Sequence, residues 1–191
     1  MTTTRPQRRT QAERRAASRT ALIEAAARGI SRQGYTRGAL YHQFPSKEAL
    51  ALAIVVWIGE TWEAEVGPAF AQDQDPAATL VDVAREHAIY CRSDAAAVMQ
   101  MLHVEFSQRD HPVGQAVGDL MDELLTRIRR LITAGRRQGT IPPGPPVADS
   151  ARAFIGVLEA VAVSTGGRRP HDVELTVRAV RGILGLPPGT A

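Results

Sequence analysis

Apolar residues recur at spacings of three and four positions along most of this chain, and this periodicity restricts it to helices. The longest example runs from Val113 to Arg137, where one face of a helix would be continuously apolar. Its inward positions are Val117, Leu120, Met121, Leu124, Leu125, Ile128, Leu131 and Ile132. The sequence contains no alternating strand pattern, internal repeat or useful coiled-coil heptad. It therefore predicts an all-α protein.

Glycine, proline and capping residues divide this pattern into separate helices. Gly34 and the pair His111-Pro112 interrupt it, and the run from Pro142 to Pro146 interrupts it again. The predicted helices cover residues 12–33, 37–44, 46–66, 79–92, 94–108, 113–137, 147–165 and 172–184. The helix over 46–66 would be about 30 Å long, enough to join a small N-terminal head to a larger helical bundle.

The composition favours a folded, soluble protein. The 191 residues are 44% hydrophobic, which is enough for a sizeable core, and 23% charged. A single cysteine, Cys91, excludes an intramolecular disulfide and suits a reducing cytoplasm. The apolar run from Ala49 to Ile58 is too short to cross a bilayer, and no targeting segment is recognisable. We therefore expect a cytoplasmic protein with no membrane partner.

Charge is distributed unevenly between the two ends of the chain. Residues 1–47 hold ten Lys and Arg against two acidic residues, a balance of +8. Residues 48–191 hold thirteen against eighteen, a balance of −5. A basic N-terminal segment beside an acidic remainder indicates an anionic partner for the first segment, and nucleic acid is the natural candidate.

The stretch from Arg37 to Leu50 carries the most specific chemistry. Leu40 and Phe44 are four positions apart, so on a helix they share one face and bury together. The residues left facing outward are Arg37, Ala39, Tyr41, His42 and Gln43. A guanidinium, a methyl group, a phenol, an imidazole and an amide on one short helix are suited to phosphates and base edges in a major groove.

Pro45 ends this short helix, and a new helix follows directly. Ser46 is a good N-cap for the second helix, and Glu48 falls in its first turn. Lys47 thereby lies beside a helix N-terminus, where unpaired backbone N–H groups and the helix dipole attract an anion such as a DNA phosphate.

The same stretch resembles the end of the helix-turn-helix of TetR-family transcriptional regulators, in which a Gly-Ala-Leu-Tyr-His-His-Phe-x-Ser-Lys-Glu-x-Leu pattern is typical. The matching residues are Gly38, Ala39, Leu40, Tyr41, His42, Phe44, Ser46, Lys47, Glu48 and Leu50, with Gln43 in place of the second histidine. The resemblance implies that Lys47 contacts the DNA backbone. The residues it places on the DNA side are Arg37, Gly38, Ala39, Tyr41 and His42. The alternative is that Tyr41 and His42 only cover a small helical core.

The chain departs from the family between Gly34 and Arg37, where it has only Tyr35 and Thr36. A helix-turn-helix needs a scaffold helix and a turn there, on the order of ten residues or more. Either the chain carries a natural or engineered deletion, or the printed residues are the ordered part of a longer chain that has lost a disordered segment. We favour the second, because a deletion should expose the apolar face of the short helix.

The resemblance also implies two domains, a DNA-binding head over residues 1–47 and a ligand-binding and dimerisation domain over residues 48–191. In the family the last two helices form the dimer interface, and here both carry apolar faces. The residues predicted for that interface are Phe154, Ile155, Leu158, Val161, Leu175, Val180 and Ile183. Burial within a single subunit is the alternative for each of them.

A ligand pocket is harder to place from the sequence. Candidates for a mainly apolar cavity are Tyr90, Met99, Leu102, His103, Phe106, Leu124 and Phe154, each of which could also be ordinary core. His87 and Cys91 are four positions apart and could hold a soft metal, but two ligands without a third are weak evidence. We expect no metal and no cofactor.

The motifs favour a regulator over an enzyme. The sequence has no Gly-rich phosphate loop, no Gly-x-Ser-x-Gly elbow and no His-Glu-x-x-His. His103 and Glu105 are two positions apart on one predicted helix, so they face different directions and make a poor catalytic pair. A helical enzyme that uses His87, His103 or Glu159 remains a remote alternative.

The resemblance and the residues together predict a homodimeric, ligand-responsive repressor that reads a palindromic double-stranded DNA operator. A largely apolar small molecule would be its effector. The main alternative is a helical ligand-binding or protein-interaction dimer that has lost DNA binding with the missing scaffold helix. Salt-dependent DNA affinity would separate the two hypotheses.

Overall fold

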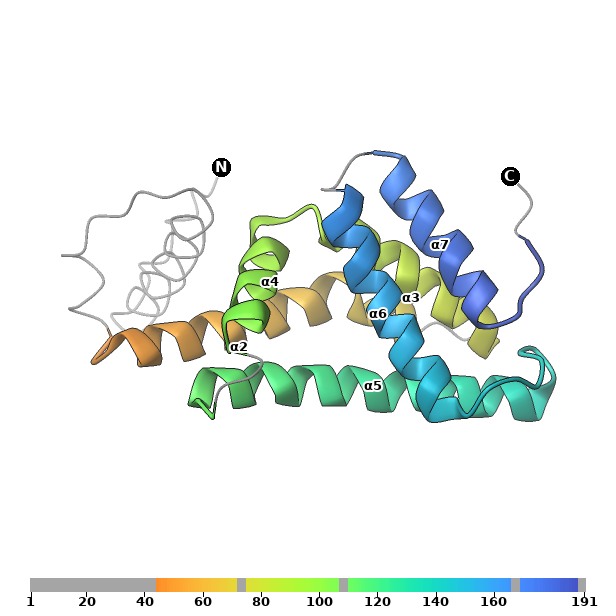
Figure 1. Ribbon diagram of the computed structural model, residues 1–191, viewed down its shortest axis with the longest axis horizontal. Helices are drawn as coiled ribbons and strands as arrows, with labels where there is room; N and C mark the ends of the chain where they lie inside the picture. The colour runs from red at the N-terminus through yellow and green to blue at the C-terminus, as the bar shows by residue number, and fades with distance from the viewer. Residues whose placement is uncertain (1–43, 72–74, 107–109, 166–168, 189–191) are drawn as a thin grey trace, which may run out of the picture.

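The computed structural model describes residues 44–71, 75–106, 110–165 and 169–188. Within these ranges the chain is helical and contains no strand (Figure 1). The elements are α2 (Lys47–Glu65), the 3-10 helix η1 (Gly67–Ala71), α3 (Pro76–Tyr90), α4 (Asp94–Phe106), α5 (Pro112–Gln138), α6 (Val147–Thr165) and α7 (His171–Ile183). The predicted all-α class is confirmed, and none of the described helices is long and apolar enough to cross a membrane.

The helix α2 follows the sequence prediction closely. The hydroxyl of Ser46 accepts a hydrogen bond from the Ala49 N–H at 3.0 Å and caps the helix, while Ile54 and Ile58 are buried on its inner face. Phe44, immediately before the cap, is 5% exposed and belongs to the hydrophobic core. The prediction that Phe44 is buried is therefore confirmed for the chain as printed, whereas Leu40 lies outside the described residues.

The helix α3 begins earlier than the sequence indicated, and α4 begins where it was predicted but has Ser93 as its cap. The carboxylate of Asp75 accepts from the N–H groups of Ala77 and Ala78 at 2.8 and 3.0 Å, so α3 begins at Pro76 and not near Thr79. The helix α4 is capped by the hydroxyl of Ser93 and not by Asp94, which lies in its first turn.

The long helix α5 is capped at both ends. His111 accepts from the Val113 N–H through Nδ1 at 3.2 Å, and its Nε2 lies 3.6 Å from the carboxylate of Glu48 at the start of α2. At the other end Gly139 adopts a left-handed conformation with φ of 78°, which favours glycine and turns the chain toward α6. The start of α5 thus contacts the start of α2.

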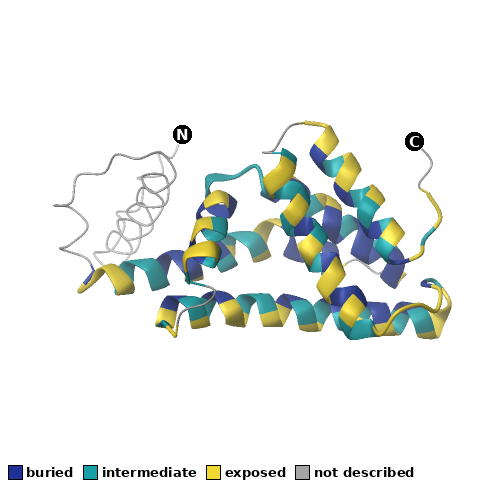
Figure 2. Cartoon of the chain, in the orientation of Figure 1, coloured by how far each residue is buried: buried dark blue, intermediate teal, exposed yellow. Residues whose placement is uncertain are grey.

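The packed core lies where α5 and α6 join and where α3, α6 and α7 meet. Phe154, Ile128 and Ile132 are completely or almost completely buried there (Figure 2). Gly135 of α5 allows close contact with Ile141, because a Cβ at this glycine would lie only 2.6 Å from the Ile141 Cδ1. This end of the bundle has no spare volume for a larger side chain.

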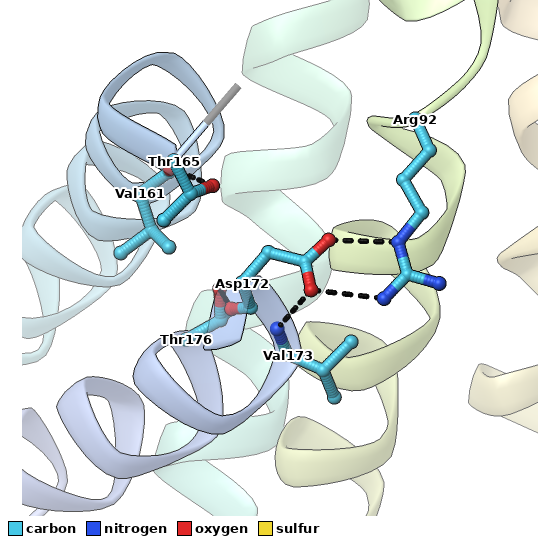
Figure 3. A network of polar contacts seen from close by, with 6 residues as sticks. All are labelled: Arg92, Val161, Thr165, Asp172, Val173 and Thr176. Atoms are coloured by element: carbon cyan, nitrogen blue, oxygen red, sulfur yellow. Dashed lines mark hydrogen bonds and ion pairs between the residues drawn. The ribbon is translucent and has the colours of Figure 1, made fainter. Parts of the chain in front are cut away.

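A buried ion pair joins the end of α3 to the start of α7. Arg92 donates through Nε and Nη2 to the two carboxylate oxygens of Asp172 at 2.7 and 2.9 Å, and Asp172 also accepts from the Val173 N–H (Figure 3). The guanidinium of Arg92 holds the pKa of the Asp172 carboxyl below its ordinary value. This pair fixes α7 against α3.

Candidate functional site

The predicted DNA-reading residues fall mostly outside the described part of the chain. Arg37, Gly38, Ala39, Tyr41 and His42 lie there, and so do the bonds from Tyr35 to Gly38, where the sequence analysis expects an omitted segment. Of the predicted DNA contacts, Lys47 lies within the described residues. It is exposed and is the first residue of α2, directly after the capping Ser46. The backbone N–H groups of that first turn have no acceptor within the helix, which makes this end of α2 suited to a phosphate.

A cavity of about 760 Å³ lies inside the bundle, between α2, α3, α4, α5 and α6. Its volume falls within the range of small-molecule sites, and most of its lining side chains are apolar. The apolar lining residues are Val56, Ile58, Gly59, Trp62, Tyr90, Cys91, Ala96, Met99, Val104, Leu120, Met121, Leu124, Ile155, Leu158 and Val163. The polar ones are Glu60, Glu63, His87, Gln100, His103, Glu123, Arg127 and Glu159.

The predicted pocket residues divide between this cavity and other places. Tyr90, Met99, His103 and Leu124 line the cavity. The predictions that Leu102, Phe106 and Phe154 do so are wrong. Leu102 and Phe154 are buried in the core, and the Phe106 ring lies 4.8 Å from the ring of His111. All three sit on amphipathic helices whose apolar stripe is wider than the part that faces the cavity.

A buried histidine forms one wall of the cavity. The indole N–H of Trp62 donates to Nδ1 of His87 at 3.1 Å, so the neutral ring carries its proton on Nε2. Burial lowers the pKa of His87 to about 4, because the charged imidazolium would lose its hydration. Near neutral pH the ring is therefore uncharged, with Nδ1 as an acceptor and Nε2–H as a donor.

The hydroxyl of Tyr90 is directed to the backbone of α2. It donates to the Ile58 carbonyl oxygen at 3.3 Å and lies 3.3 Å from the hydroxyl of Thr61. Burial is the main cause that raises the pKa of Tyr90 to about 12. The ring of Tyr90 thus lines the cavity, while its hydroxyl hydrogen-bonds to α2 and holds α3 against that helix.

An ion pair closes the end of the cavity beside η1. Arg127 donates to the carboxylate of Glu63 at 2.6 and 3.4 Å, and its guanidinium carbon lies 3.8 Å from the centre of the Phe70 ring and 5.7 Å from that of Trp62. Arg127 is the single Lys or Arg among the described residues that line the cavity. Its charge is already matched by a carboxylate.

The helix α2 connects the two candidate regions. Its first residues carry the predicted phosphate contact, and its second half forms a cavity wall through Ile58, Gly59 and Trp62. At Gly59 a Cβ would lie 3.2 Å from Leu120 of α5, so the two helices approach closely at this point.

Comparison with known proteins agrees with this arrangement. Residues 30–54, which include the recognition stretch and the start of α2, match the model for bacterial regulatory proteins of the tetR family. The TetR-family regulator SCO4454 from Streptomyces coelicolor has the same fold, with a TM-score of 0.70 over 90% of this chain and 95% of that chain at 20% identity. Residues 30–54 therefore match the tetR-family motif, and the chain has the fold of TetR-family regulators.

Two further structures share the TetR fold and were solved with ligands. AibR in complex with isovaleryl coenzyme A and operator DNA has a TM-score of 0.71 at 20% identity, covering 87% of this chain and 97% of that one. FadR from Bacillus subtilis in complex with stearoyl-CoA has a TM-score of 0.69 at 16% identity, covering 86% and 97%. No curated protein matches the chain in sequence.

The residues predicted for a TetR-type dimer interface are only partly on the surface. Phe154, Leu158 and Val180 are at most 2% exposed inside one protomer, which leaves them little surface for contact with a second copy. Ile155 lines the cavity, and Leu175 is 45% exposed. Val161 and Ile183 are half-buried. The large apolar residues of α6 and α7 face inward because burying them stabilises the protomer itself.

The pair formed by His87 and Cys91 does not resemble a metal site. Burial, with Asp172 and Glu159 nearby, raises the pKa of the Cys91 thiol to about 12, so it is not a thiolate. Nδ1 of His87 is occupied by Trp62. Among the described residues no group of three or more His, Cys, Asp or Glu could hold a metal ion.

The sequence analysis did not predict that several residues line the cavity, among them Trp62, Met121 and Arg127. A signal was present for Trp62, because it continues the four-residue spacing of Ile54 and Ile58 along α2. No comparable signal exists for Arg127, since an arginine on an amphipathic helix is ordinarily solvated.

Proposed function

We propose that this TetR-family regulator is a dimeric repressor that a small molecule releases from a palindromic operator. The observation that carries the proposal is the course of α2, which begins beside the DNA-binding motif and ends as a wall of the 760 Å³ cavity. A ligand in that cavity touches the helix that bears the head. Such a regulator acts in the cytoplasm, where a bacterial chromosome lies.

Operator reading would use two copies of the helix over residues 37–44, placed in successive major grooves of the DNA. Arg37, Ala39 and His42 lie nearest the bases in this proposal, and Gly38 allows close approach. Tyr41 and Lys47 fix the register on phosphates. The exposed position of Lys47 at the capped start of α2 supports its part.

Release by the ligand follows from differential binding. If the ligand prefers the protomer arrangement in which the two heads no longer match the operator spacing, it lowers DNA affinity by the ratio of its two affinities. The ligand complexes of AibR and FadR support ligand binding within this fold, since both chains share it along almost their full length.

Dimerisation would use the outward faces of α6 and α7. Small residues lie on that face of α6, namely Ala153, Gly156 and Ala160, and α7 adds Leu175 and Gly182. A Cβ at Gly156 or Gly182 would meet no atom of the protomer within 4 Å, so a partner helix can approach both.

An arginine at Gly156 tests this face. Gly156→Arg should halve the molar mass in light scattering while the circular dichroism stays helical, because the side chain enters open space in the protomer. The matched control is Gly118→Arg on α5, another exposed helical glycine with nothing within 4 Å of a Cβ. Dimers in both variants would exclude the proposed interface.

The DNA-binding part is tested with the full chain. Selection from random duplexes should enrich a palindrome, and Tyr41→Ala combined with His42→Ala should abolish binding to it while the protein stays dimeric. Affinity should also fall steeply with salt concentration, because phosphate contacts release counterions. Unchanged affinity of the double variant would refute the assignment of the reading helix.

One observation favours the second candidate, a ligand-binding dimer without operator affinity. Only Tyr35 and Thr36 separate Gly34 from Arg37, where a scaffold helix and turn are needed. The burial of Phe44 in the chain as printed weakens our reason for assuming an omitted segment, since a deletion was expected to expose it. The same selection decides, because this candidate predicts no enriched sequence and no salt-dependent binding.

A further inference from the structure

The charges around the cavity disfavour an anionic ligand. Glu60, Glu63, Glu123 and Glu159 contribute four carboxylates to its lining, against the single guanidinium of Arg127. That guanidinium is engaged by Glu63 at 2.6 Å. Among the described residues no other Lys or Arg lines the cavity. A phosphate or carboxylate entering here would meet net negative charge in a largely apolar space.

One polar group that lines the cavity is the imidazole of His87. Trp62 occupies Nδ1 at 3.1 Å, which leaves the proton on Nε2. Among the described residues no hydrogen bond from Nε2 is present, and the half-buried ring lines the cavity. A ligand acceptor in the cavity would give this N–H group a partner.

The other polar ends near His87 are already used. The Tyr90 hydroxyl is held by the Ile58 carbonyl and Thr61, and the Trp62 indole donates to His87 itself. Arg127 stacks on the aromatic ring of Phe70 beside this group. Among these neighbouring groups, Nε2–H is the donor left for a ligand, and the mostly apolar lining suits a ligand with one acceptor and an apolar body.

From these two observations we infer that the cavity selects an uncharged, largely apolar ligand whose carbonyl-type oxygen accepts a hydrogen bond from His87 Nε2–H, an inference that rests on the ligand-responsive function proposed above. The effector class is then a ketone, ester, lactone or amide. It differs from the coenzyme A thioesters bound by AibR and FadR, whose nucleotide phosphates would face the cavity glutamates.

Four ten-carbon probes test the ligand class on the full-length protein: 2-decanone, decanoate, decylammonium and decanoyl-CoA. Isothermal titration calorimetry below the aggregation limit of each probe gives the affinities. In a Trp57→Phe background the remaining tryptophan is Trp62, so its fluorescence reports whether a probe enters the cavity. We expect 2-decanone to bind roughly tenfold or more tightly than either anion, because burying an unpaired charge is costly.

Substitutions of His87 test the hydrogen bond. His87→Phe should weaken 2-decanone binding by about five- to tenfold, the effect of one hydrogen bond, whereas His87→Gln keeps a donor and should stay within about twofold of the parent. His171→Phe is the control, since His171 is an exposed histidine of α7 that does not line the cavity and its change should leave the ketone affinity unchanged.

The outcomes separate this inference from the function on which it rests. Equal or tighter binding of decanoate, decylammonium or decanoyl-CoA overturns the ligand class, and a charged probe that also releases the selected operator leaves the ligand-responsive repressor intact. Undiminished ketone affinity in His87→Phe overturns the role of Nε2. Failure of all four probes overturns both the inference and the ligand cavity. The wild-type probe series stands on its own if a His87 variant does not fold.

Discussion

The two ends of the α5–α6 pair differ sharply, although the same two helices form both. Near the turn that joins them, Ile128 and Ile132 of α5 pack against Phe154 of α6 and all three are fully buried. Further from the turn, Met121 and Val163 on the same helices line the cavity. Figure 1 shows α6 crossing away from α5 over this distance.

The difference shows how a bundle can hold a cavity and remain folded. The turn between Gly139 and Val147 fixes the helices at one end, where Gly135 lets Ile141 approach closely. Arg92 and Asp172 fix the start of α7 to the end of α3 (Figure 3). With these contacts made, the other end does not have to be closely packed, so stability and ligand capacity are located in different parts of the bundle.

The largest difference in the free energy of unfolding is expected between two side-chain truncations to alanine. Phe154→Ala should lower the free energy of unfolding by about 3 to 5 kcal/mol, because it leaves a void in a close-packed region. Met121→Ala, in the cavity lining, should cost only about 1 kcal/mol, since its neighbours already face empty space. Urea unfolding followed by circular dichroism measures both. Equal losses would mean that the cavity end is packed as tightly as the turn end.

Acid should weaken the cavity end through His87. Its pKa falls from 6.5 in the unfolded chain to about 4 in the folded protein. Below pH 6.5 the unfolded chain therefore binds a proton at His87 that the buried native ring does not bind. The free energy of unfolding decreases for this reason as the pH falls toward 4. The loss between about pH 7 and about pH 4.5 should be about 2 to 3 kcal/mol.

The glutamine variant isolates this contribution from that of other titrating groups. His87→Gln has no ring to protonate, so its unfolding free energy should fall less over the same pH range. The Asp172 carboxylate titrates equally in both proteins, so its contribution cancels in the difference. Parallel pH profiles for the two proteins would show that His87 is not buried as a neutral ring.

Alanine at two glycines of α5 should shift stability in opposite directions. Gly135→Ala forces a Cβ to 2.6 Å from Ile141 and should destabilise by about 1 to 3 kcal/mol. Gly118→Ala meets no atom within 4 Å and should stabilise by about 0.5 to 1 kcal/mol through helix propensity alone. Thermal unfolding compares the two. A stabilising Gly135→Ala would contradict the close contact at the turn end.

The smallest effect is expected at the start of α5. His111→Ala removes the Nδ1 acceptor of the Val113 N–H and should cost about 1 kcal/mol, as other cap losses do. His111→Asn can still cap the helix and should restore most of that loss in the same denaturation assay. A full loss in the asparagine variant would place the importance of His111 in its contact with Glu48 instead.

The helices were predictable from the sequence because their signals are local. The cap Ser46 and the four-residue spacing of Leu50, Ile54 and Ile58 predict α2, and the run from Pro142 to Pro146 predicts the break after α5. The start of α3 was placed three residues late, because Asp75-Pro76 was read as a connection although it is a cap followed by proline at the first helical position.

The cavity could be predicted only in part, because it depends on which apolar residues lack a neighbour. Periodicity shows that Phe154 and Met99 both face inward, but it does not distinguish a packed position from an open one. The hydrogen bond from the Trp62 indole to His87 joins residues 25 positions apart, so no local sequence pattern predicts it. The same holds for α6, where periodicity could not tell the core face from the outer face.

The close approach of Gly59 to Leu120 gives α2 the geometry of a lever. From this contact the helix extends about 18 Å toward Lys47 and about 9 Å toward Glu65, from the rise per residue. A tilt about the contact therefore moves the Lys47 end about twice as far as the Glu65 end. A ligand that displaces the Glu65 end of α2 by about one ångström would move the start of the helix by about two, in the opposite direction.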